Sequence, residues 1–112
     1  MINTNIDLMQ CLNDKVILLD TALRELSRRG QIYAQAEHDY RVSLAEKILI
    51  EKSNGMSVTL ISDICRGDKK IAKLKFERDC AEVVYKSALE AINAIKLQIK
   101  VIDNTIQREW TS

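Results

Sequence analysis

The stretch SNGMSVTLISDICRGDKK, residues 53–70, interrupts a chain that otherwise repeats apolar residues at helical spacing. At its start, Asn54 and Gly55 supply residue types that adopt the left-handed backbone region, which commonly ends a helix. Either Ser57 or Thr59 can then cap a new helix, because a hydroxyl oxygen accepts a hydrogen bond from a free N–H of the first turn. The stretch therefore predicts that one long helix ends here and a short helix follows.

The end of the same stretch predicts a second restart of the chain. Gly67 can end the short helix, and the Asp68 carboxylate can cap the helix that follows. We therefore expect helices over residues 5–52, 59–66 and 69–110, with the two long ones antiparallel. This is an all-α helical hairpin, or coiled-coil bundle, and it forms a single domain from all 112 residues.

Both long segments carry a heptad seam, in which apolar residues alternate spacings of three and four. The first helix should begin near Thr4, because Thr4 and Asp7 have the spacing of a capping box. The first seam comprises Leu12, Val16, Leu19, Leu23, Leu26, Gly30, Tyr33, Glu37, Tyr40 and Leu44. The second comprises Ile71, Leu74, Arg78, Ala81, Tyr85, Ala88, Ile92, Ile95, Ile99, Ile102 and Ile106.

Three seam positions are not apolar. Gly30 costs about 1 kcal/mol of helix propensity relative to alanine, so it needs a structural reason. Close approach of the helix backbones opposite Ala88 and Ala91 is one such reason, and a hinge is another. Glu37 and Arg78 can pair with each other, within one chain or between chains, and such a pair favours one register.

Further apolar residues flank both seams, and a two-helix hairpin cannot bury them all. They are Ile17, Leu18, Ile32, Val42, Leu49, Ile50, Phe76, Val84, Leu89, Leu97 and Val101. The short helix can cover part of this surface near the corner. A second subunit is the expected cover for the end around residues 95–106, so we expect a homo-oligomer.

Composition excludes several classes of protein. The net charge is +1, so any attraction to nucleic acid must come from a local patch. No apolar run approaches the ~18 residues that a membrane span needs, and the N-terminal segment lacks the pattern of a secretory signal. We therefore expect no membrane association and a cytoplasmic location. Cys11, Cys65 and Cys80 are odd in number and far apart, which predicts reduced thiols packed as small hydrophobic residues.

A basic surface is expected where the second long helix begins. Helix N-termini present free N–H groups and a partial positive charge, which favour an anion. Together with the outward face of the short helix, the candidate surface for an anion or a partner comprises Ser62, Asp63, Arg66, Lys69, Lys70 and Lys73. The alternative is a solvated lysine-rich face, and the carboxylate of Asp68 competes with any incoming anion.

Nothing in the spacing predicts a catalytic, cofactor or metal site. His38 is the only histidine, and neighbouring residues on a helix point about 100° apart, so it cannot converge with Glu37 and Asp39 on one ion. Arg24 and Arg28 belong to a second basic cluster with Arg29, for which a solvated face is the simpler interpretation. We therefore expect that the protein is not an enzyme.

Two segments resemble small all-helical proteins from the early regions of temperate phages and prophages of Gram-positive bacteria. These are RRGQIYAQAEHDYRVSLAEKIL, residues 28–49, and VTLISDICRGDKKIAKLKFERDCAEVVYKSALEAINAIKLQIKVID, residues 58–103. The resemblance carries over no catalytic or binding residue. It implies a phage product that acts in a bacterial cytoplasm.

Two functions follow as expectations. The first is a non-catalytic, oligomeric binding protein that blocks or sequesters a host component, such as a defence protein or an anionic nucleotide signal. The alternative is a nucleic-acid-binding accessory protein of phage replication or recombination. The aromatic residues are Tyr33, Tyr40, Phe76, Tyr85 and Trp110, and three of them lie in seams, which leaves few to stack on exposed bases.

Overall fold

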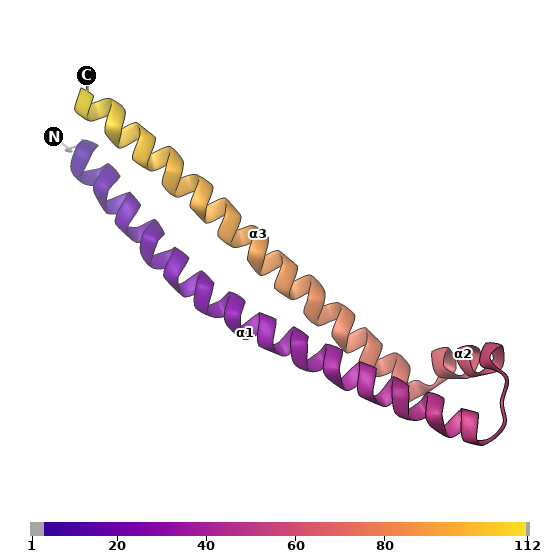
Figure 1. Cartoon of the computed structure of the whole chain (residues 1–112). Helices are drawn as coiled ribbons and strands as arrows, with labels where there is room; N and C mark the ends of the chain where they lie inside the picture. The colour runs from indigo at the N-terminus through magenta and orange to yellow at the C-terminus, as the bar shows by residue number, and fades with distance from the viewer. Residues whose placement is uncertain (1–3, 112) are drawn as a thin grey trace. The chain divides into compact units, whose positions relative to one another are not determined.

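The described residues form three helices, which Figure 1 colours in chain order. The computed structural model describes residues 4–111, and the helices are α1 (Thr4–Ser53), α2 (Val58–Gly67) and α3 (Lys69–Thr111). No strand occurs within that range. The expected all-α fold, with two long helices joined by a short one, is confirmed. The capping box expected at Thr4 depends on a side chain that lies outside the described part of the chain.

The end of α1 is a Schellman motif centred on Gly55. Gly55 has a φ of 80°, and its N–H donates to the Lys52 carbonyl at 3.0 Å. The next N–H, that of Met56, donates to the Glu51 carbonyl at 3.2 Å. These two bonds satisfy carbonyls that the helix end leaves free. Asn54 does not adopt the left-handed region that was expected for it, because its N–H continues the helical pattern to Ile50 at 3.1 Å.

The two helix starts after the corner are capped by side chains. Of the two candidates for α2, Ser57 is the cap, and its hydroxyl accepts from the Leu60 N–H at 3.4 Å. At the start of α3, Asp68 Oδ1 accepts from the Ile71 N–H at 2.9 Å, as expected. Each bond satisfies one free donor of a first turn, so the sequence fixes both starts locally.

The chain divides into two compact units. One unit contains Met1–Arg28 and Lys86–Ser112, and the other contains Arg29–Tyr85. In the first unit, Ile92, Ile95 and Ile106 of α3 are buried. The expectation that the end around residues 95–106 lacks cover within the chain is therefore wrong for Ile95 and Ile106, whereas Leu97 and Val101 remain exposed.

The first seam is displaced in two places from its expected line. Val16 and Leu23 are 49% and 44% exposed, whereas Lys15 and Ala22 beside them are half-buried. A lysine side chain can cover apolar surface with its methylene groups, so a charged residue can occupy a contact position. The expected seam was placed on Val16 and Leu23 because they are the larger apolar residues.

The apolar residues that flank the seams remain on the surface in both units. They range from 38% exposed at Val84 to 68% at Phe76. In the described residues, no helix combines the length and the apolar character needed to cross a bilayer.

Candidate binding site at the α2 corner

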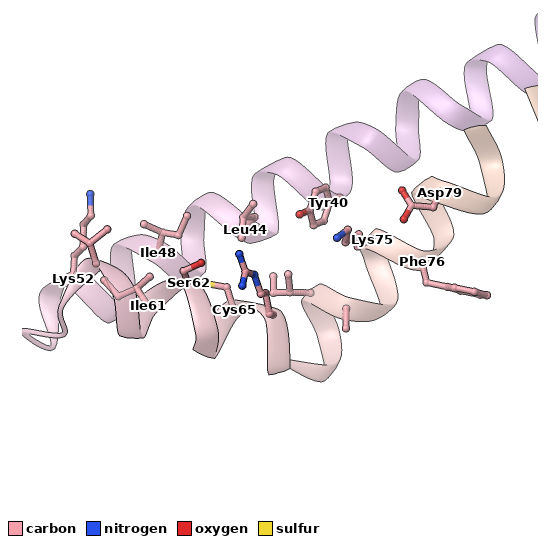
Figure 2. Close-up of a pocket in the computed structure, with 14 residues that line it drawn as sticks. Tyr40, Leu44, Ile48, Lys52, Ile61, Ser62, Cys65, Lys75, Phe76 and Asp79 are labelled. Atoms are coloured by element: carbon pink, nitrogen blue, oxygen red, sulfur yellow. The ribbon is translucent and has the colours of Figure 1, made fainter. Parts of the chain in front are cut away.

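A groove of ≈ 670 Å³ lies within the second unit, where α2 packs beside α1 and the start of α3. Figure 2 shows the side chains that line it. Its apolar lining comes from all three helices and includes Leu44, Ile48, Val58, Ile61, Cys65, Ile71 and Phe76. A groove of this size and character falls in the range of ligand and partner sites.

The amphipathic sequence of α2 builds one wall of the groove. Ile61 and Cys65 are one turn apart and are 3% and 5% exposed, so this face of α2 anchors it to the unit. Leu60, on another face of the same helix, is exposed. Ser62 follows Ile61 in the chain and Arg66 follows Cys65, and both lie at the edge of the groove.

The three cysteines are free thiols in different surroundings. Cys65 is buried, as expected for a small hydrophobic residue, whereas Cys11 and Cys80 are exposed. The expectation that all three are packed is therefore wrong for Cys11 and Cys80.

Cations dominate the polar edge of the groove. Lys52 of α1, Arg66 of α2 and Lys75 of α3 all line it. Figure 2 places Lys52 and Lys75 toward different ends, so these charges are spread along the groove. The one carboxylate in the lining is Asp79, and it already accepts hydrogen bonds from Arg78 at 3.0 and 2.8 Å.

The structure does not gather the six predicted surface residues into one site. Ser62 and Arg66 line the groove, while Asp63 does not and lies 4.0 Å from Arg66 as an exposed ion pair. The remaining three residues are exposed and lie outside the groove; they are Lys69, Lys70 and Lys73.

Several groove residues were not predicted as site residues. Tyr40 and Lys52 belong to α1 and Phe76 to α3, and the packing of the helices brings them to α2. Of these three residues, Phe76 could have been predicted from the sequence as a surface contact, because it is a large aromatic residue beside the seam. Lys75 also lines the groove, on a different face of α3 from Lys69 and Lys73.

Arg78 supports one end of the groove. Its Nη1 donates to Glu37 Oε2 at 3.3 Å, so the two charged seam residues pair within one chain. Its guanidinium also lies 4.6 Å from the centre of the Tyr40 ring, and Tyr40 lines the groove. The hydrogen bond to Asp79, with the nearby Glu37 charge, raises the pKa of Arg78. The guanidinium therefore stays charged and holds both Tyr40 and Asp79 in place.

An ion-pair network supports the α3 start at the corner. Lys47 of α1 lies 3.2 Å from Glu51 and 3.7 Å from Asp68. The hydrogen bond with Glu51 is the main cause of a raised pKa at Lys47. The bond from the Ile71 N–H, assisted by Lys47, lowers the pKa of Asp68. The cap of α3 is therefore joined electrostatically to α1.

The second basic cluster has carboxylate partners. Arg24 lies 2.8 Å from Asp20, and Arg28 lies 2.7 Å from Glu25. The hydrogen bonds that Arg28 donates to the Glu25 carboxylate raise the pKa of Arg28. Pairs of this kind between neighbouring turns are typical of a solvated helix face.

The lone histidine has a carboxylate neighbour but no metal-binding set around it. His38 Nδ1 lies 3.3 Å from Asp39 Oδ1. The hydrogen bond from Gln35, and to a smaller extent the one with His38, lowers the pKa of Asp39. Across residues 4–111, no cluster of three or more His, Cys, Asp or Glu side chains is placed to hold a metal ion.

Comparison of the chain with protein-family models, with curated proteins and with solved structures finds no match. The groove and its charges are therefore the starting point for function.

Proposed function

We propose that the protein is a non-catalytic, oligomeric phage-type binding protein that blocks or sequesters a component of the bacterial host. In this proposal the groove at the α2 corner is the surface that holds the host component. The observation that carries it is an apolar groove of ≈ 670 Å³ edged by Lys52, Arg66 and Lys75. A stable apolar floor with charged edges is the usual composition of a recognition surface.

The proposed oligomer draws on the apolar residues left exposed outside the groove. Leu97 and Val101 of α3 are 62% and 56% exposed and lie one turn apart on the same helix. Ile17 and Leu18 of α1 are also exposed in the same unit. A second copy of the chain is the proposed cover for this surface, because contiguous apolar patches commonly mark an interface.

One observation favours the alternative, a nucleic-acid-binding accessory protein. Lys69, Lys70 and Lys73 are exposed at the start of α3, and within residues 4–111 none of them forms an ion pair. Such cations can contact phosphates. Binding of this kind weakens steeply with salt, because each phosphate contact releases counterions.

Affinity capture with matched variants tests the proposal. The bait is the whole protein, incubated with lysate of a Gram-positive host, and mass spectrometry covers both co-purifying proteins and nucleotides. Ser62→Arg places a long side chain in the groove, whereas Thr59→Arg makes the same change at an exposed residue of α2 outside it. We expect a component that wild type and Thr59→Arg retain and Ser62→Arg loses. Equal capture by both variants would contradict the proposed site.

A further inference from the structure

We infer that the groove at the α2 corner takes an acidic amphipathic helix of a partner protein. This inference rests on the proposed function and specifies the chemistry of the component that the groove holds. It depends on three features of the groove, which are its length, the distribution of its cations and the state of its single carboxylate.

The length of the groove fits a short helix. Its lining on α1 runs from Tyr40 to Lys52, which is about 18 Å of helix at ~1.5 Å per residue. A partner helix of about three turns covers that length. Its apolar residues at positions i, i+3 or i+4, and i+7 would lie on the floor, as in other helix-in-groove complexes.

The position of the cations favours an extended acidic partner over a single phosphate group. Lys52, Arg66 and Lys75 come from three different helices and do not share one turn. Lys52 and Lys75 lie toward different ends of the groove (Figure 2). A nucleotide or an isolated anion is bound best where donors converge, whereas carboxylates on successive turns of a helix can meet charges that are spread out.

The floor of the groove disfavours nucleic acid. Leu44, Ile48 and Ile61 provide apolar surface where a polynucleotide would place phosphates or sugars. Phosphate contacts dominate nucleic-acid binding, and an apolar floor offers them no hydrogen-bond donors. The exposed side chain of Phe76, at 68%, is better matched to the apolar face of a helix.

Charge also disfavours a second copy of this chain as the occupant through a twofold contact. In such a contact the same patch meets itself, so Lys52, Arg66 and Lys75 of both copies would share one interface. Asp79 cannot readily balance them, because Arg78 already donates to it at 3.0 and 2.8 Å. A partner helix with Asp or Glu beside its apolar stripe supplies the missing charge.

A displayed library of amphipathic helices tests this inference without knowledge of the natural partner. The library fixes an apolar stripe and randomises the flanking positions among acidic, basic and neutral polar residues. The wild-type protein should enrich Asp and Glu at those positions, and binding of the selected peptides should weaken as salt rises. Enrichment of basic or neutral residues, or recovery of no binding peptide, overturns the inference.

Two charge-matched triple variants locate the binding to the groove. Lys52→Gln, Arg66→Gln and Lys75→Gln together remove the groove cations, and we expect about a tenfold weaker Kd for a selected peptide. Lys69→Gln, Lys70→Gln and Lys73→Gln together remove as much charge outside the groove and should change Kd less than about twofold. Equal losses in the two variants overturn the inference.

The outcomes separate this inference from the proposed function. If lysate capture still yields a groove-dependent component that is a nucleotide, a nucleic acid or a second copy of the chain, the acidic-helix inference fails while the groove remains a binding site. If Ser62→Arg and Thr59→Arg capture the same components, the proposed function itself fails.

Discussion

The ring of Tyr85 lies 3.3 Å from the position that a Cβ atom would occupy on Gly30. The glycine therefore faces a large aromatic side chain, and the expectation that it faces Ala88 and Ala91 is wrong. The Tyr33 ring lies beside this ring, with the two ring centres 5.9 Å apart. Tyr33 is itself tied to α3 by a hydrogen bond from its hydroxyl to Glu82 at 2.8 Å. Close approach explains the glycine.

We predict that Gly30→Ala lowers the free energy of unfolding by about 1 kcal/mol, because the crowding of Tyr85 outweighs the gain in helix propensity. In a Tyr85→Ala background, the same substitution should raise it by up to ~1 kcal/mol. Urea unfolding followed by circular dichroism measures both values. If Gly30→Ala instead stabilised the protein in the wild-type background, the Tyr85 ring would be able to move away from the added methyl group without destabilising the fold.

Arg78→Ala should destabilise the protein by about 2 kcal/mol, because it leaves a partly buried Glu37 without this partner and removes the contact with Tyr40. Arg24→Ala is the control, since Arg24 also pairs with a carboxylate, at 2.8 Å, but on an exposed surface. That change should cost less than ~0.5 kcal/mol. Equal effects of the two substitutions in urea unfolding would contradict the structural role of Arg78.

The stability of the corner should depend on pH through Asp68. Its pKa is lowered in the folded protein, below the usual value of about 3.9. The ionised Asp68 carboxylate therefore stabilises the folded protein above about pH 4, and this stabilisation is lost as the pH falls through the folded-state pKa of Asp68.

Asp68→Asn tests this dependence, because asparagine keeps a capping oxygen but cannot ionise. Wild type should be the more stable at pH 7, and the difference should shrink toward pH 3, as measured by urea unfolding. Asp68→Ala is the matched control and should lower the stability at pH 7 as well, because the cap is lost. A difference between wild type and Asp68→Asn that grows on acidification would contradict the assignment.

The proposed oligomer predicts different results for exposed and inward residues of α3. The double substitution Leu97→Asp and Val101→Asp should reduce the mass measured by light scattering at micromolar concentration. Helicity should be retained, because both residues are exposed. Ile99 is half-buried, so Ile99→Asp should instead reduce helicity, since a buried charge destabilises the fold. A wild-type protein that is monomeric at high concentration would exclude the oligomer.

Local signals predicted the corner well. Ser57, Gly55 and Asp68 act through hydrogen bonds to residues within a turn or so, and such bonds depend only on the nearby sequence. The long helices were likewise predicted by a repeat that continues through each segment. These features account for most of the fold.

The groove could not be predicted in the same way. It joins Tyr40 and Lys52 of α1 with Ser62 of α2 and Phe76 of α3, so it depends on the register between helices. Heptad spacing defines a stripe but leaves the register open. The misplaced partner of Gly30 shows the consequence, because the expected Ala88 lies almost one turn from the observed Tyr85.

Site-specific photo-crosslinking in host cells tests the central claim most directly. A photoreactive amino acid at Ser62 probes the groove, and the same amino acid at Thr59 probes an exposed position of α2 outside it. We predict a discrete crosslinked host component from position 62 that is absent from position 59 and lost when Lys52, Arg66 and Lys75 are all changed to glutamine. The same products from both positions, or none from position 62, would contradict the claim that this groove binds a host component.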